Sequence, residues 1–247
     1  MSPLVAATVP FLMFILLIGW LWRNQRRSVA ARKAAARSVP LYPLYPVQFE
    51  AAPDLPVPFG YKTQWLAVRT TDTEAVAKCL RLERPQPANW KTGMNGAAAG
   101  YYFVTPPVHG WTLVVNPYMP DLSGKEEPGP LQLLERLSAA FGEAGYFASH
   151  RVVGYHAWVR ARKGEIVRGY AYVGEQGETI LDHGGLSSAE REANLTFTGL
   201  EAEEPVLPDE DDVLLMAKLW SVDPAMAQGG YEAGTGLAGV LESAPEE

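Results

Sequence analysis

The order of strand-like and helix-like patterns between residues 60 and 223 is the feature that most constrains the fold. Alternating apolar residues predict strands, and apolar residues three or four apart predict helices. In chain order the patterns are TQWLAVRT, DTEAVAKCLRL, GYYFVTP, GWTLVVN, GPLQLLERLSAAFGEAG and YFASHRVV. The first, third, fourth and sixth predict strands and the other two predict helices. This β-α-β-β-α-β order is that of the ferredoxin-like plan.

Three further patterns follow this core. Two strand-like runs flank Lys163-Gly164 and predict a hairpin, and ETILDHG predicts one more short strand. DEDDVLLMAKLW predicts a closing helix whose acidic first turn complements the helix dipole. We therefore predict an α+β fold: a ferredoxin-like core, an added antiparallel hairpin and a C-terminal helix. The run TGMNGAAAG lacks the Lys-Ser or Lys-Thr of a phosphate loop, and we expect a mobile loop there.

The N-terminus contains a long uncharged run. Residues 4–22 are nineteen positions without charge, and a helix of that length covers about 28 Å. We predict a transmembrane anchor over residues 1–22; the alternative is a cleaved signal peptide, which needs a basic start that Met1-Ser2-Pro3 does not supply. Six basic residues follow the run before the first acid, Glu50, which places the N-terminus outside and the rest in the cytoplasm.

Composition suggests five parts. Residues 23–37 form a basic juxtamembrane segment, and residues 38–59 form a proline-rich linker. A proline-rich ligand for an aromatic groove is the alternative for this linker. Residues 60–223 form the α+β domain, and residues 224–247 form a flexible acidic tail. The single cysteine, Cys79, fits a reducing compartment.

The charge distribution favours some partners over others. The chain carries 21 Lys and Arg against 28 Asp and Glu, for a net charge of −7. From Leu186 onward, fourteen acids face only two bases, Arg191 and Lys218. Binding of nucleic acid needs Lys and Arg to neutralise phosphates, so we do not expect it. A basic protein partner, attracted electrostatically, is expected instead.

The hairpin suggests a binding surface. A two-residue turn at Lys163-Gly164 places Trp158 opposite Gly169 and His156 opposite Ala171. In this register one face carries His156, Trp158 and Arg160, and the other carries Tyr155, Tyr170, Tyr172, Val159 and Arg168. We predict that the Trp158 face is open and binds a partner together with the acidic segment. The predicted binding residues are His156, Trp158, Arg160, Glu203, Glu204, Asp209 and Asp211. The alternative is that one face is core and the other is a solvated, amphipathic sheet surface.

Catalytic and metal signals are weak. The four histidines, His109, His150, His156 and His183, lack the spacing of a metal motif, so we predict no metal, no cofactor and no catalytic residue. Cys79 falls mid-helix on an apolar stripe, where a thiol acts as a small hydrophobe. The enzyme alternative uses His156 and His183 with Glu178 or Asp182 as acid and base.

Several runs, among them FGYKTQWLAVRTTDTEAVAKCL and FVTPPVHGWTLVV, resemble a family of uncharacterised bacterial domains linked to toxin–immunity loci. The resemblance covers residues 59–224, does not include the predicted anchor, and implies no catalytic residue; with the anchor, it predicts a protein of the bacterial inner membrane. Together with the acidic domain, it predicts a membrane-tethered binding protein facing the cytoplasm, most concretely an immunity protein that occludes a toxin. The alternatives are a membrane-anchored enzyme and a structural module of an envelope complex.

Overall fold

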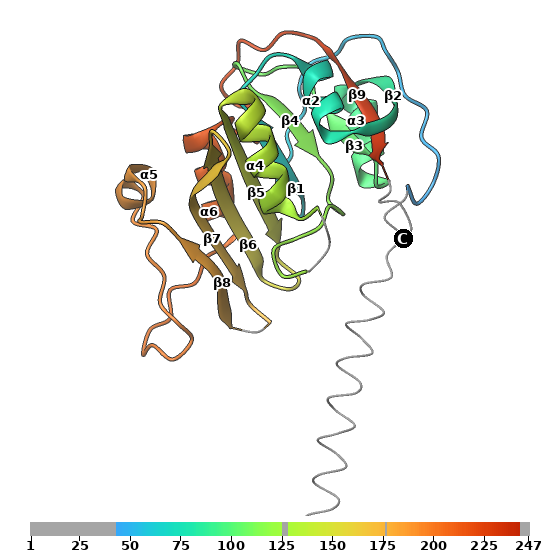
Figure 1. Cartoon of the computed structure of the whole chain (residues 1–247). Coiled ribbons are helices and arrows are strands. Elements are labelled where there is room, and N and C mark those ends of the chain that lie inside the picture. Colours follow the sequence, from blue (N-terminus) through green and yellow to red (C-terminus); the bar gives the residue numbers. More distant parts are fainter. Residues whose placement is uncertain (1–42, 125–127, 176, 243–247) are drawn as a thin grey trace, which may run out of the picture. The chain divides into compact units, whose positions relative to one another are not determined.

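The computed structural model describes residues 43–124, 128–175 and 177–242. Within them, nine strands form one antiparallel sheet in the order β2-β9-β3-β4-β1-β5-β6-β7-β8 (Figure 1). The strands are β1 (Gln64–Val68), β2 (Leu82–Asn89), β3 (Tyr102–Val104), β4 (Thr112–Val115), β5 (Glu143–His150), β6 (Tyr155–Arg162), β7 (Glu165–Val173), β8 (Glu178–His183) and β9 (Thr235–Leu241). The helices are α2 (Thr73–Leu80), α3 (Trp90–Ala98), α4 (Pro130–Phe141), α5 (Ser188–Glu192) and α6 (Glu210–Trp220).

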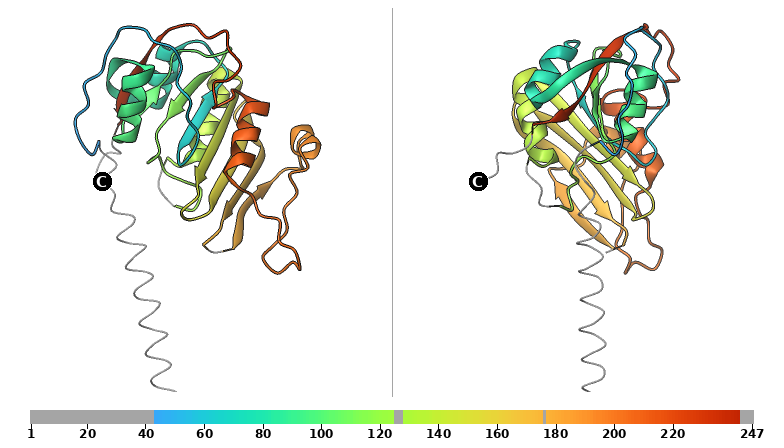
Figure 2. Two further views of the ribbon diagram at one scale, coloured as in Figure 1. Left: turned by 180° about the vertical axis from the view of Figure 1, so that it is seen from behind. Right: turned by 90° about the vertical axis from the view of Figure 1, so that its right-hand side faces the viewer.

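Helices cover both faces of the sheet (Figure 2). On one face, α2 and α4 pack on a cluster rich in Leu, Val, Ala and Tyr, which we call the aliphatic core. On the other face, α3 and α6 pack on a cluster that includes five tryptophans, which we call the aromatic core. Strand β1 contributes to both, because Trp65 lies in the aromatic core and its neighbour Leu66 lies in the aliphatic core. A strand covered on both sides is buried at every position, as β1 is.

The predicted α+β, ferredoxin-like fold class is wrong. Instead of a four-stranded core with additions, the described residues form a nine-stranded antiparallel sheet. Strand β2 and helix α3 intervene between α2 and β3 in the chain, and β9 lies between β2 and β3 in the sheet. The expected antiparallel pairing of residues 65–68 is confirmed, since β1 pairs with β4 and β5. The placement of α2 and α4 on one face is also confirmed.

The two elements that the sequence hid are β2 and α3. Pro85 and Pro87 interrupt β2, and proline cannot donate to a ladder, so the run did not resemble a strand. The glycine-rich run expected to be a loop forms α3 instead. A Cβ at Gly93 would lie 2.2 Å from the Phe103 ring, so glycine is what lets α3 pack flat on the sheet. These glycines serve close packing rather than mobility.

Both ends of the described chain differ from the prediction. Residues 43–59 lie against the domain instead of forming a spacer. The Leu44 amide donates to the Ala99 carbonyl at 2.7 Å, and the Phe59 ring meets Trp65 edge-on at 5.3 Å. The expected flexible tail contains β9, which pairs with β2 and β3. Gly236 allows this, because a Cβ there would lie 2.2 Å from the Val104 carbonyl oxygen.

No described helix is long and apolar enough to cross a membrane. The predicted anchor, residues 1–22, and the predicted basic segment, residues 23–37, lie outside the described residues. The prediction of a single-pass protein of the inner membrane is therefore not supported, and we do not retain it. An uncharged run of nineteen residues has the length and hydropathy of a membrane helix, but these two properties alone do not establish that it spans a membrane.

Candidate functional site

A bulge in the β6–β7 hairpin overturns the predicted binding surface. Arg162 faces Glu165 as expected, but the register shifts between Arg160 and Ala161, so Trp158 faces Tyr170 instead of Gly169. An extra residue sends every later side chain of β7 to the opposite face. Tyr170, Tyr172 and Arg168 therefore share the face of Trp158, while Tyr155 and Val159 lie in the aliphatic core.

The Trp158 face is covered instead of open. Trp158 is completely buried, and its ring stacks on Tyr170 at 4.8 Å. His156 is 5% exposed. Arg160 is half-buried and pairs with Glu143 beside the Trp220 ring of α6. Of the three hairpin residues predicted to bind a partner, none lies on an open surface.

Trp158 instead belongs to a buried charged network. Its Nε1 donates to Glu190 Oε1 at 3.0 Å, and the Arg168 Nε donates to both Glu190 oxygens at 2.9 and 3.0 Å. Arg168 Nη1 also donates to Asp182 Oδ1 at 2.6 Å and to the His183 carbonyl at 3.0 Å. Arg168 and Glu190 are 4% and 1% exposed as side chains. The network joins β6, β7, β8 and α5.

Glu190 is held ionised by this network. Burial would raise the pKa of Glu190, but hydrogen bonds from Arg168, Trp158 and Ser187 outweigh it, so the pKa is lowered. Ser187 and Glu190 form a capping box, in which the Ser187 amide donates to Glu190 Oε2 at 2.7 Å. A buried pair that is fully bonded in this way holds the short helix α5 against the sheet, so its role is structural.

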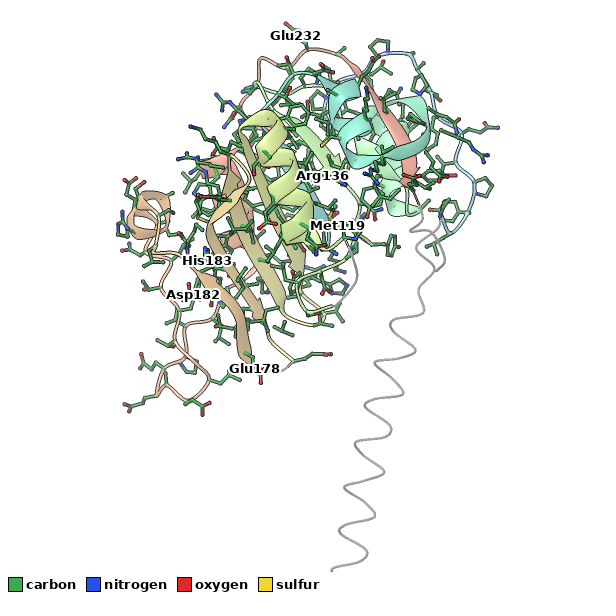
Figure 3. The ribbon with its side chains drawn as sticks, viewed as in Figure 1. Met119, Arg136, Glu178, Asp182, His183 and Glu232 are labelled. Carbon is green, nitrogen blue, oxygen red and sulfur yellow. The ribbon has the colours of Figure 1, made fainter. Side chains whose placement is uncertain are left out.

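The residues of the enzyme alternative do not meet. His183 faces Gly169 and Glu178 faces Val173, four positions apart along β7, or about 13 Å. Figure 3 shows Asp182 and His183 at one end of β8 and Glu178 at the other. His156 faces Tyr172 in the aromatic core, whereas Gly169, opposite His183, faces Val159 of the aliphatic core. The two histidines therefore project to opposite faces of the sheet.

Metal-ligand geometry is also absent from the described part of the chain, where no three His, Cys, Asp or Glu side chains are grouped to hold an ion. Cys79 is half-buried on α2 and packs against the aliphatic core, as its apolar stripe predicted.

The predicted acidic binding residues do lie on the surface. Residues 174–212 contain twelve acids and one base, Arg191. Glu203 and Glu204 are exposed in a loop closed by the Thr198 amide, which donates to the Val206 carbonyl at 2.9 Å. Asp209 and Asp211 are exposed at the start of α6. Asp209 caps the helix by accepting from the Asp211 and Asp212 amides at 2.8 and 3.1 Å.

An apolar and aromatic patch adjoins these acids. Asp211, Leu215 and Leu219 follow one another at intervals of four on the outer side of α6, so they form one stripe. Leu215 is 36% exposed and Leu219 is 49% exposed. Tyr61 is 59% exposed, and its hydroxyl donates to Asp211 Oδ1 at 3.2 Å. We call the surface formed by Tyr61, Asp209, Asp211, Leu215 and Leu219 the α6 face.

Buried polar groups fix the start of α6 from beneath. Glu210 accepts from the Ser149 hydroxyl at 2.7 Å and from the Lys62 amide at 3.2 Å, and it lies 3.8 Å from Arg151. Ser149 faces His156 across the β5–β6 pair. Burial lowers the pKa of His156, although Glu210 and Asp209 act to raise it. Glu210 thus anchors the helix terminus that displays Asp209 and Asp211.

Sequence reasoning missed Tyr61, Leu215 and Leu219. The signal was present in α6, where the core side is made by Val213, Met216, Ala217 and Trp220. Leu215 and Leu219 fall outside that stripe at helical spacing, which is the pattern of apolar residues left for solvent or a partner. The predicted residues Asp209 and Asp211 are brought together with them, whereas His156, Trp158 and Arg160 are not.

The sequence matches no protein-family model and no curated protein, and the fold matches no solved structure. The resemblance to bacterial domains linked to toxin–immunity loci therefore stays a prediction. Function is therefore inferred from the geometry of the α6 face.

Proposed function

We propose that this chain is a binding protein that captures a basic protein partner on the α6 face and, as an immunity protein does, blocks that partner by occlusion. The observation that carries the proposal is the exposed Tyr61, Leu215 and Leu219 beside the acids Asp209 and Asp211. Interfaces bury aromatic and apolar anchors at their centre and keep polar groups at the rim.

The negative charge near the α6 face favours a basic partner. Residues 174–212 carry twelve acids against a single Lys or Arg, and this segment ends in the first turn of α6. Complementary charge speeds encounter and suppresses wrong partners, and its effect falls as salt rises. A basic partner therefore gains both steering from the acids and desolvation energy from the apolar stripe.

The test begins with affinity capture from cells that carry this gene, and a captured protein counts only after it is purified and titrated. We expect a basic protein whose affinity falls as salt is raised. The double variant Leu215→Gln/Leu219→Gln keeps the net charge and the helix propensity. It should weaken binding by about 2 kcal/mol, the loss typical of interface hot spots.

Leu55→Gln is the matched control, because Leu55 is 58% exposed on the segment before β1. It should bind as the parent chain does. Equal affinity of the double variant and the parent would place the partner elsewhere and refute the α6 face. A partner that binds independently of salt would refute the electrostatic part of the proposal.

A further inference from the structure

The two edges of the sheet differ in how well they are closed to another strand. Edge strands expose unpaired backbone donors and acceptors, and proteins protect them with proline, bulges and charge. Strand β2 has Pro85 and Pro87, and its register with β9 shifts between Glu83 and Gln86. Strand β8 forms the other edge and contains neither proline nor glycine. Proline therefore blocks the β2 edge, whereas no proline interrupts β8.

The outer side of β8 is unpaired within the described residues. Its ladder to β7 uses one side only, and no backbone bond joins β8 to a described segment on the other side. The two central residues of β8, Ile180 and Leu181, are half-buried. The other four are exposed: Glu178, Thr179, Asp182 and His183. One bulge lies at Ile180, which has no facing residue on β7, but the strand continues on both sides of it.

We propose that β8 receives an extended segment of the basic partner as a tenth strand, which rests on the proposed function and extends the contact beyond the α6 face. Strand addition to an exposed edge draws affinity from main-chain hydrogen bonds and specificity from alternate side chains. The carboxylates of Glu178 and Asp182 flank an apolar centre, Ile180 and Leu181. This pattern fits a strand with apolar residues at its centre and Lys or Arg on either side.

The surroundings of β8 support a basic occupant. The preceding turn carries Glu175, and the loop with Glu203 and Glu204 reaches the same end, because Leu200 packs against Gly177. Arg168 offsets part of the charge of Asp182, but the Asp182 side chain is still 62% exposed. A cationic strand at this edge meets carboxylates on the strand and on the loop beside it.

A second copy of the chain fits less well. Strand β8 carries two carboxylates, Glu178 and Asp182, and no Lys or Arg. Two copies paired edge to edge would bring four carboxylates to one ladder, and like charges across a ladder destabilise a pair. A basic strand brings the opposite charge to the same edge.

The experiment uses the full chain and three synthetic nine-residue peptides. The first has three Val residues at its centre and three Lys residues on either side, the second has the same sequence with N-methyl groups on the amides of one edge, and the third replaces Lys by Glu. Binding is followed by fluorescence anisotropy and by amide hydrogen exchange. We expect the Lys peptide to slow exchange within residues 178–183. The N-methylated peptide should bind at least tenfold more weakly, because it lacks the main-chain donors of that edge, and the Glu peptide should bind more weakly still.

Four outcomes would overturn the proposal. Protection at residues 209–220 alone would place the peptide on the α6 face, refuting strand addition and leaving the proposed function intact. Equal binding of the N-methylated peptide would mean capture by side chains only. Sedimentation of the free chain as a dimer that Ile180→Pro dissociates would assign the edge to a second copy. No binding of the Lys peptide would also refute it. The proposed function would still be tested separately, by titrating the purified partner against Leu215→Gln/Leu219→Gln.

Discussion

The two cores of the molecule solve the burial of polar groups differently. In the aliphatic core two buried tyrosines, Tyr146 and Tyr155, form a neutral hydrogen-bonded group. Tyr146 donates to Gln64 at 2.5 Å, Tyr146 and Tyr155 lie 3.1 Å apart, and the Leu122 amide donates to Tyr155 at 3.1 Å. In the aromatic core an ion pair, Arg168 and Glu190, is buried beside Trp158. One side of the sheet buries neutral polar groups, and the other buries charge.

The aromatic side also leaves more polar atoms without partners. In the part of the chain that the structure describes, these atoms include Trp90 Nε1, His156 Nδ1, Tyr172 OH and Trp220 Nε1, whereas Arg136 Nε on α4 is the example from the other side. Unpartnered buried groups cost stability. The face that carries this cost is the one that α6 covers, so the helix with the candidate binding surface rests on the less completely bonded side. The aliphatic core is therefore the scaffold, and the aromatic core positions the site.

The largest expected effect is a loss of folding stability when one buried side chain of each core is truncated to alanine. Trp158→Ala should destabilise the fold by about 5 kcal/mol, because it leaves a large cavity and removes a donor to Glu190. Leu137→Ala in the aliphatic core should cost about 3 kcal/mol, since only a cavity is left. Urea unfolding of both variants measures this difference. A smaller loss for Trp158→Ala than for Leu137→Ala would contradict it.

A smaller effect is expected from the ion pair itself. Glu190→Leu leaves Arg168 buried without its main partner and should cost about 3 kcal/mol. The double variant Arg168→Met/Glu190→Leu removes both charges and should recover much of that loss. The measurement is a double-mutant cycle by urea unfolding. If the double variant is no more stable than Glu190→Leu, the network does more than neutralise a buried charge.

The sequence predicted local elements well and their arrangement poorly. Asp72 caps α2, accepting from the Ala75 amide at 2.8 Å, and Asp209 caps α6, because capping depends on neighbouring residues alone. Strand β9 pairs with β2 across about 150 residues, and nothing local in a glycine-rich tail signals such a partner. The fold class failed on these long-range pairings.

The candidate site shows the same division. Asp209 and Asp211 were predicted from composition, and they are exposed on α6. The prediction placed Trp158 on an open surface because it counted the register outward from a turn at Lys163-Gly164. That count holds only if no bulge follows the turn. The shift between Arg160 and Ala161 moves Tyr170 to the face of Trp158. One residue of slip changes which side chains share a face, and alternation alone does not reveal the slip.

The smallest expected effect is a difference in pH response between the two cores. Burial lowers the pKa of His156 below its ordinary 6.5, and the network around Glu190 lowers the pKa of that carboxyl below 4.5. In both cases the unfolded chain takes up the proton first. The stability that these two groups contribute is therefore fully present above pH 6.5 and is lost as pH falls, first through His156 and, below pH 4.5, through Glu190.

The aliphatic core should respond to base instead. Burial raises the pKa of Tyr102 above its ordinary 10, so the unfolded chain loses its proton first, and stability is lost as pH rises past 10. Urea unfolding across pH measures both limbs. His156→Gln should flatten the loss just below pH 6.5, and Tyr102→Phe should reduce the loss above pH 10; the exposed His150→Gln is the control that should change neither limb. If His156→Gln leaves the slope unchanged, the imidazole is not neutral beneath α6, and the contrast between the two cores fails on its aromatic side.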